Sequence, residues 1–372
     1  MVDRRMLIVG GGIAGLSLRL ALRGSPWGVE LVERNAGSDQ PGAGLAVQPN
    51  AMRVLRTLAV AEAVEAAGAI VIRFEYRDRQ GELLCAIDLR DLWGEVGPFV
   101  GVTRRALHEA LRSTVGRCRS GRSAVSVHQQ DGRVHVAFDD ATAAYYALVV
   151  GADGVHSRTR TSAVTPAGPV YAGQMAWRSL APVGCGTGDS VQFFLGTDRF
   201  FGLCPVGDEV TYGFGNVTCG RLYDPVAGRK RRLAGRFADF GRPVQEYIVA
   251  IRSDEDIHPG PISWYPDIAW HNGRVVLIGD AAHAMSPMMG QGGCMAVEDS
   301  LVLAEELCRH GDVATALTAF TERRAPRVAW VRDQSQALGE LVGLPADIRD
   351  RALRTHGTAA FHDRYRPLVA AP

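Results

Sequence analysis

Residues 6–33 of the chain read MLIVGGGIAGLSLRLALRGSPWGVELVE, which predicts a strand, a glycine-rich turn, a helix and a second strand ending on an acid. Gly10, Gly12 and Gly15 have the G-x-G-x-x-G spacing of a dinucleotide-binding turn. The first glycine allows a tight turn, the second lets backbone N–H groups approach a pyrophosphate, and the third lets the helix pack closely on the sheet. Glu33 follows about 20 residues later, where a carboxylate can bond an adenosine ribose. The order of these elements predicts a Rossmann-type unit.

Length and composition limit the remaining possibilities. A chain of 372 residues exceeds the size at which a single core stops growing, so we expect two domains. With 47% hydrophobic and 22% charged residues, the composition is that of an ordinary globular protein. The formal net charge of +1 gives no support for a nucleic-acid partner or an acidic membrane partner.

Cysteine usage and hydropathy predict a cytoplasmic protein. The seven cysteines show neither C-x-x-C pairs nor metal-ligand spacing, which fits a reduced compartment and no structural metal. No stretch reaches the roughly 18 consecutive apolar residues of a membrane span. The apolar segment near the N-terminus is too short for a secretion signal and runs directly into the glycine turn.

Two later stretches also combine glycines with an acid. GADGVHSR at 151–158 contains Asp153 and Gly154 after a buried-looking strand. In GRVVLIGDAAHAMSPMMGQGGCMAVEDS at 273–300, a short apolar strand leads to Asp280, at the edge of a sheet where ligands of open α/β folds bind. Further along, glycines 290, 292 and 293 precede a long helical run. A glycine-lined helix N-terminus offers free N–H donors and a positive dipole to an anionic group.

Local turn signals predict several further elements. Thr103 can cap a helix that begins next to it, and Asp131-Gly132 lies between two apolar runs as a hairpin turn. Residues 69–77 and 83–87 flank a second expected hairpin. Residues 166–268 hold aromatic-rich, alternating runs, which predict an antiparallel sheet.

The three glycine-and-acid stretches, in this order, resemble the fingerprints of the FAD-dependent class A aromatic hydroxylases, the para-hydroxybenzoate hydroxylase group. In its length and in its GQGGC motif, the chain most resembles the compact urate, salicylate and hydroxynicotinate hydroxylase-like members. The resemblance covers nearly the whole chain. It implies an α/β fold with a Rossmann-type, glutathione reductase-like FAD domain, an inserted antiparallel-sheet substrate domain and C-terminal helices. We expect residues 1–68, 98–165 and 266–340 to form the FAD domain, 69–97 and 166–265 the substrate domain, and 341–372 a helical tail that caps the FAD domain.

The resemblance implies non-covalent FAD. Asp280 is implied to bond the ribityl chain, and the glycines after it to face the N1–C2 edge of the isoalloxazine. Arg104 matches the family's R-x-x-L-x-x-x-L helix, with Arg105 as the alternative by one register, and Thr159 stands where the family usually has an aliphatic residue. The full set of expected cofactor residues is Gly10, Gly12, Ile13, Ala14, Gly15, Glu33, Arg34, Arg104, Asp153, Gly154, Asp280, Gly290, Gly292 and Gly293.

The implied activity is that of a single-component monooxygenase. NADH or NADPH reduces the FAD, O₂ reacts with it, and a C4a-hydroperoxyflavin hydroxylates an aromatic or other electron-rich small molecule. A second G-x-G-x-x-G unit is absent from the sequence, so the nicotinamide cofactor is expected to dock transiently, and its identity stays open. Epoxidation or Baeyer–Villiger oxygenation in secondary metabolism, and a flavin-binding protein without turnover, remain alternatives. Halogenation is disfavoured because Lys230 is the single lysine and W-x-W-x-I is missing.

The substrate pocket is expected where the aromatic sheet covers the flavin. Arg178 is a candidate for holding a substrate carboxylate or enolate, and Pro287 for a place beside the reactive oxygen. These two are the candidate catalytic residues, no general base is evident, and His283 is interpreted as a structural hydrogen-bonding residue. The expected pocket residues are Gln48, Trp177, Arg178, Phe194, Phe201, Tyr212 and Pro287. We expect a monomer or a homodimer.

Overall fold

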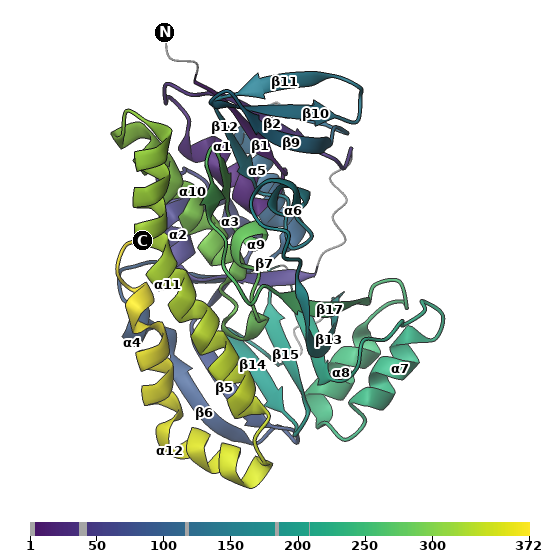
Figure 1. Cartoon of the computed structure of the whole chain (residues 1–372). Coiled ribbons are helices and arrows are strands. Elements are labelled where there is room, and N and C mark those ends of the chain that lie inside the picture. The colour runs from purple at the N-terminus through teal and green to yellow at the C-terminus, as the bar shows by residue number, and fades with distance from the viewer. Residues whose placement is uncertain (1–3, 37–42, 116–118, 183–185, 208) are drawn as a thin grey trace.

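The computed structural model describes residues 4–36, 43–115, 119–182, 186–207 and 209–372 (Figure 1). The described residues contain a six-stranded sheet in the order β18-β19-β12-β1-β2-β8, which includes the N-terminal unit. β1 pairs in parallel with β2 on one side and β12 on the other, and β12 pairs in parallel with β19. The strands are β1 (Arg5–Val9), β2 (Gly28–Glu33), β8 (Arg119–Ser120), β12 (Leu148–Gly151), β18 (His271–Asn272) and β19 (Val275–Leu277). The predicted Rossmann-type unit is confirmed.

Both faces of this sheet are buried, which explains its continuous apolar strands. Met6 and Ile8 face the large core shared with helices α1 (Ile13–Ala21), α5 (Arg104–Val115) and α10 (Gly292–Arg309). Leu7 and Val9 belong to a separate core with a three-stranded antiparallel sheet. That sheet has the order β11-β10-β9, with β9 (Ala124–Gln130), β10 (Arg133–Phe138) and β11 (Ala143–Tyr146).

Local turn chemistry is confirmed at the predicted positions. Asp131 and Gly132 connect β9 to β10 with φ angles of 50° and 72°, the left-handed values that a two-residue hairpin turn requires. The Thr103 hydroxyl accepts a hydrogen bond from the Ala106 N–H at 3.1 Å, so it caps α5. Short-range signals therefore place these elements correctly.

A seven-stranded sheet forms the other half of the molecule (Figure 1). Its order is β17-β13-β16-β15-β14-β5-β6, antiparallel except for the parallel pair β14 and β5. The predicted hairpin of β5 and β6 thus joins strands that lie far later in the chain. The strands are β5 (Arg73–Asp78), β6 (Leu83–Asp88), β13 (Val170–Ala181), β14 (Ser190–Leu195), β15 (Arg199–Pro205), β16 (Thr211–Thr218) and β17 (His258–Trp264).

Alternation along β16 separates the two faces of this sheet. Tyr212 and Phe214 point to one face, while Gly213 and Gly215 lie on the other. A Cβ at Gly213 would lie 2.3 Å from the Tyr247 ring, and one at Gly215 would lie 2.7 Å from a ring atom of Phe237. These glycines therefore let α7 (Arg229–Arg236) and α8 (Arg242–Ala250) pack closely on that face.

A small sheet in the order β3-β7-β4 joins the two halves. A Cβ at Gly101 of β7 would lie 2.0 Å from the Pro205 carbonyl oxygen of β15, so the two sheets meet here backbone to backbone. β4 lies within the segment predicted for the substrate domain but pairs with β7. The elements of this region are β3 (Gly44–Val47), β4 (Ala69–Val71), β7 (Phe99–Thr103), α2 (Pro49–Thr57), α3 (Ala61–Ala67) and α4 (Leu89–Trp93).

The C-terminal helices span both halves (Figure 1). The tail was expected to cap the FAD domain, yet α12 packs on β6 of the large sheet, and the buried Arg349 donates to the Leu195 and Gly196 carbonyls. Residues 367–370 return to α2 and α11, and Arg364 of α12 also accepts a hydrogen bond from Trp330 of α11. The remaining elements are α6 (Arg158–Ala163), α9 (Asp280–His283), η1 (Pro287–Met289), α11 (Val313–Val342), α12 (Ala346–Tyr365) and η2 (Arg366–Leu368). Within the described ranges, no helix has the length and apolar character needed to cross a membrane.

Candidate functional site

A cavity of about 440 Å³ lies between the Tyr212 face of the seven-stranded sheet and the loops that contain the second and third glycine-and-acid stretches. Its polar lining includes Arg178, Tyr212 and Asn216 from the sheet, and Asp280 from the opposite wall. Aromatic rings cover much of the sheet side, and glycines 290, 292 and 293 form part of the loop side. The cavity therefore has an aromatic wall and a glycine-lined wall facing each other.

The three glycines of the N-terminal turn have different physical roles. Gly10 has a φ of +114°, and a Cβ there would lie 2.3 Å from the Ala152 carbonyl oxygen. A Cβ at Gly15 would lie 1.9 Å from the Gly10 carbonyl oxygen. At Gly12, a Cβ would meet no described atom within 4 Å. The fold itself therefore requires the first and third glycines, while the second leaves open space at the start of α1, next to Ile13 and Ala14.

Glu33 lies against this turn. Its carboxylate accepts hydrogen bonds from the Gly11 N–H at 2.7 Å and the Asn35 N–H at 2.9 Å. His108 of α5 contacts the Gly11 carbonyl at 2.8 Å and fixes the turn from the other side. Arg34, the next residue, is exposed. Carboxylate oxygens accept several hydrogen bonds, so Glu33 retains capacity for a ribose hydroxyl.

Asp153 organises its own turn. One carboxylate oxygen accepts from the Ser157 hydroxyl at 2.5 Å, and the other accepts from the Thr159 N–H and hydroxyl at 3.0 and 3.1 Å. Thr159, the departure from the family pattern, is thus a hydrogen-bonding partner of Asp153. Gly154 follows with a φ of +77°. Arg160 is fully buried and donates to the carbonyls of Ala281, Ala282 and Asp267, so this turn is connected directly to α9.

The structure distinguishes the two arginines at the start of α5. Arg105 forms an exposed ion pair with Glu109 at 2.8 Å. Arg104 is close enough to the cavity for its charge to act on Tyr212. Of the two, Arg104 therefore lies nearer the cavity.

Asp280 and the glycine loop, residues 287–293, face the same end of the cavity. Asp280 is exposed at the first position of α9, and one of its carboxylate oxygens lies 3.8 Å from the Cβ position of Gly292. Gly290 has a φ of +65° and ends η1, after which α10 begins at Gly292. A free carboxylate beside a helix N-terminus without side chains can bind a neutral polyol and an electron-rich ring edge together.

These features fit FAD. The open space at Gly12 and the start of α1 suit a pyrophosphate, Glu33 suits a ribose, and Asp280 with the α10 N-terminus suits the ribityl chain and ring. Backbone without side chains at Gly290, Gly292 and Gly293 leaves room for a planar ring next to the aromatic wall. The fold and the cavity define a flavoprotein with a Rossmann-type FAD domain.

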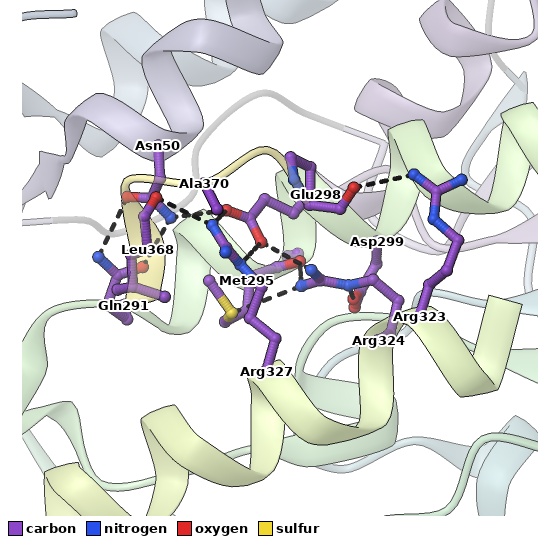
Figure 2. Close-up of polar contacts among 12 residues, drawn as sticks. Asn50, Gln291, Met295, Glu298, Asp299, Arg323, Arg324, Arg327, Leu368 and Ala370 are labelled. Atoms are coloured by element: carbon purple, nitrogen blue, oxygen red, sulfur yellow. Dashed lines mark hydrogen bonds and ion pairs between the residues drawn. The ribbon is translucent and has the colours of Figure 1, made fainter. Parts of the chain in front are cut away.

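A buried polar network, unrecognised in the sequence, lies behind the glycine loop (Figure 2). The fully buried Glu298 accepts from Asn50 at 2.9 Å, from Arg324 at 2.7 Å and from both donor groups of Arg327 at 2.8 Å. Asn50 also donates to Gln291 at 3.0 Å. The network continues from Gln291 to Gln48, whose amide donates to the Met289 carbonyl at 2.6 Å.

Asp299 links the same network to the Asp280 turn. Its carboxylate accepts from the Gly279 N–H at 2.9 Å, from His283 at 2.7 Å and from Arg324 at 2.8 Å. Burial alone would raise the pKa of Asp299, but the charges of His283 and Arg324 and these hydrogen bonds lower it to about 2. The structural role predicted for His283 is confirmed. Two adjacent acids in the otherwise apolar first half of α10 were the available signal for this network.

The pocket-facing residues of the sheet differ in part from the expected set. Arg178, Tyr212, Gln48 and Pro287 line the cavity. Trp177, Phe194 and Phe201 instead belong to the core under α7 and α8, on the opposite face. Phe193, Phe200 and Phe214 take their place in the cavity wall. Side chains alternate between faces, so a register one residue off selects the wrong ring on β14 and on β15.

Arg178 and Tyr212 form the polar part of this wall. Burial raises the pKa of Tyr212 to about 12, although the charge and hydrogen bonding of the adjacent Arg178 oppose the shift. Tyr212 is therefore protonated at neutral pH and acts as a hydrogen-bonding group. Among the described carboxylates, none forms an ion pair with Arg178. An arginine facing an apolar cavity in this way suits an anionic or strongly polar ligand group.

Comparison with known proteins agrees with this description. A model of the FAD binding domain family matches residues 3–215 and 265–335. Aurachin C monooxygenase/isomerase of Stigmatella aurantiaca is 34% identical over 337 residues, 87% of this chain and 85% of the relative. The 3-amino-4-hydroxybenzoate 2-monooxygenase of Streptomyces cremeus is 32% identical over 379 residues, 96% and 93% of the two chains. The crystal structure of Klebsiella pneumoniae HpxO with FAD and uric acid superposes with a TM-score of 0.90 at 26% identity, covering 98% and 97%.

The chain belongs to the FAD-binding domain family, within the class A flavin hydroxylases. It is an FAD-dependent monooxygenase, with O₂ and a reduced nicotinamide as co-substrates. The predicted family, fold class, cofactor and enzyme class are confirmed.

Proposed function

We propose that this monooxygenase oxygenates a small aromatic or heteroaromatic compound that carries an acidic or enolisable group. The observation that supports the proposal is the placement of Arg178, without a described carboxylate partner, beside Tyr212 in a wall of phenylalanine rings. A ring substrate packs against these rings, and its anionic oxygen meets the guanidinium. Relatives that act on urate and on an aminohydroxybenzoate agree with this substrate class.

We further propose which residues hold the cofactor. FAD, when bound, accepts a hydride from NADH or NADPH and then activates O₂ for transfer of one oxygen atom to the substrate. Gly12 and the first turn of α1, with Ile13 and Ala14, receive the pyrophosphate, and Glu33 receives the ribose. Asp280 receives the ribityl chain, and Gly290, Gly292 and Gly293 receive the ring. Arg104, Arg34 and the turn at Asp153 and Gly154 border the phosphate groups.

The remaining chemistry is assigned to positioning and to exclusion of water. The sheet wall holds the substrate flat against the ring site, and Arg178 fixes its orientation. Pro287 precedes the glycine loop and presents an apolar surface to the oxygen-reacting side. We assign Tyr212 as a hydrogen-bond donor to the substrate and not as a base, since its hydroxyl is protonated at neutral pH and burial makes ionisation still less favourable.

The test is a screen with purified holoenzyme. Phenolic, carboxylated and heteroaromatic compounds are measured for stimulation of NADH and NADPH oxidation, and products are identified by mass and NMR. A product with one added oxygen on an acidic aromatic ring supports the proposal. Stimulation only by neutral alkenes or ketones would assign epoxidation or Baeyer–Villiger chemistry instead, and no stimulation by any compound would favour a flavin-binding role without turnover.

We propose the FAD domain as residues 1–68, 98–165 and 266–340, the substrate domain as 69–97 and 166–265, and the tail as 341–372, in a cytoplasmic monomer or homodimer. The pairing of β5 and β6 with β14 supports the discontinuous substrate domain. Size-exclusion chromatography with light scattering measures the assembly.

A further inference from the structure

The end of the chain lies against the back of the glycine loop. Tyr365, the last residue of α12, is 2% exposed and donates its hydroxyl hydrogen to the Met289 carbonyl at 3.1 Å. Met289 ends η1, directly before Gly290. The same carbonyl accepts from Gln48, so one main-chain oxygen joins the tail, the loop and α2's N-cap residue.

A second route runs through Arg327. This α11 residue forms a bidentate pair with Glu298 and also donates to the carbonyls of Pro367 and Leu368 at 2.8 and 3.1 Å (Figure 2). Glu298 in turn accepts a hydrogen bond from the Asn50 amide, which also donates to Gln291 within the glycine loop. The Arg327 guanidinium thus donates hydrogen bonds both to the buried Glu298 carboxylate and to the backbone carbonyls of the tail.

Arg53 and Arg323 fix the remaining tail residues. Arg53 of α2 donates to the carbonyls of Val369 and Ala370 at 2.9 and 2.6 Å, and Arg323 donates to Pro372 at 2.8 Å. Leu368, which directly precedes these residues, is fully buried in the main core. Arg53, Arg323 and Arg327 therefore bind the tail through its backbone carbonyls. These contacts need the segment to be present, but they depend little on which side chains it has.

We propose that the last part of the tail, residues 365–372, is a positioning segment for the flavin: it sets the conformation of the loop 287–293 from behind, without touching the cofactor. Loss of the tail contacts leaves the Met289 carbonyl and Arg327 with fewer partners in a buried setting, which favours other loop conformations. The inference depends on FAD binding by this loop and is independent of the substrate.

The test compares two tyrosine variants of the full-length protein. Tyr365→Phe removes only the hydroxyl at the loop. Tyr171→Phe is the matched control, because the Tyr171 hydroxyl donates to the Cys219 carbonyl at 2.7 Å, in the substrate sheet. The readouts are the FAD dissociation constant, from titration of apoprotein by flavin fluorescence, and amide hydrogen exchange of residues 287–295 with and without FAD.

We expect Tyr365→Phe to weaken FAD binding about three- to tenfold, the scale of one hydrogen bond, and to accelerate exchange in the loop. Tyr171→Phe should change neither value. A chain ending at Arg366 should show the same changes in greater degree. FAD affinity and loop exchange within twofold of the parent in Tyr365→Phe would overturn the proposal, as would equal effects in both tyrosine variants. If the shortened chain fails to fold, the Tyr365→Phe result by itself tests the proposal. Neither FAD affinity nor loop exchange depends on the proposed substrate.

Discussion

The nucleotide-binding sheet and the substrate sheet specify their sites in different ways. In the first, three glycines within six residues specify the site: the backbone geometry requires Gly10 and Gly15, and Gly12 leaves open space for the ligand. In the second, the wall is built from single side chains on several strands, and only their common register places them together. A local motif can therefore be recognised from one segment of the sequence. A wall assembled across strands can be predicted only when the strand pairing is known.

The largest effects are expected at the glycine turn, where fold and ligand requirements can be separated. Gly10→Ala places a Cβ 2.3 Å from a carbonyl oxygen at a φ of +114°, so we expect failure to fold. Gly12→Ala meets no described atom, so the apoprotein should melt within about 2 °C of the parent while FAD affinity falls about a hundredfold or more. Calorimetry of the apoprotein and fluorescence titration measure the two values. Gly235→Ala, in the exposed part of α7, is the control.

Unchanged FAD binding in Gly12→Ala would contradict the placement of the pyrophosphate. It would also remove the distinction between a glycine needed for folding and one needed for the ligand.

Arginines on the two faces of the substrate sheet provide the next test. Arg178→Met should lower kcat/KM about a hundredfold, because an anionic substrate loses its charged partner, with FAD affinity unchanged. Arg236→Met removes an arginine that covers Trp177 on the opposite face at 4.5 Å, and it should leave kcat/KM within twofold. Steady-state kinetics with the substrate found by screening decide. Equal effects of the two variants would mean that the Tyr212 face is not the substrate wall.

The buried carboxylate of Asp299 in the FAD half should make stability depend on pH in acid. The carboxyl of Asp299 has a folded-state pKa of about 2 against an ordinary 3.8, so it contributes about 2 kcal/mol to stability above pH 4. This contribution is lost as the pH falls from about 4 to 2, because protonation then removes the charge that His283 and Arg324 bind. Urea unfolding between pH 2.5 and 6 measures the loss.

Asp299→Asn should be less stable at neutral pH and should lack this part of the pH dependence. An unchanged slope in that variant would show that other carboxylates control acid unfolding.

Neighbouring rings on β14 give the smallest expected effect. Phe193 lines the cavity, and Phe194 lies in the core under α7 and α8. Phe193→Leu should raise KM several-fold at a cost of about 1 kcal/mol in stability, whereas Phe194→Leu should cost a similar amount of stability with KM unchanged. Substrate kinetics and thermal unfolding of both variants check this. The reverse pattern would place the cavity on the other face of the sheet.

The sequence supports prediction where the determining contacts are short-range. The glycine turn, the Asp131-Gly132 hairpin and the Thr103 cap each depend on backbone geometry within a few residues. The faces of β13 to β16 depend on pairing between distant strands, and a shift of one residue exchanges Phe193 for Phe194. One clue was present, since the glycines of TYGFG mark the face that receives the helices.

The polar network was beyond prediction for a related reason. Glu298 is satisfied by Asn50 and Arg324, which come from helices α2 and α11, far apart in the sequence. Residues so far apart in sequence carry no local pattern that links them. Two adjacent acids in the apolar first half of α10 indicate only that partners must exist.

Strand order along the chain also governs when each sheet can close during synthesis. The glycine turn emerges early, yet β12 lacks its neighbour β19 until residue 277 has been made, and the other sheet lacks β17 until residue 264. A ribosome-arrested chain of 260 residues should therefore stay protease-sensitive and bind no FAD. Long loops must close before these pairings contribute, so both sheets form late and nearly together. The nascent polypeptide thus keeps one unpaired edge on β12 and one on β13 until these late strands are made, and an unpaired strand edge can pair wrongly during synthesis.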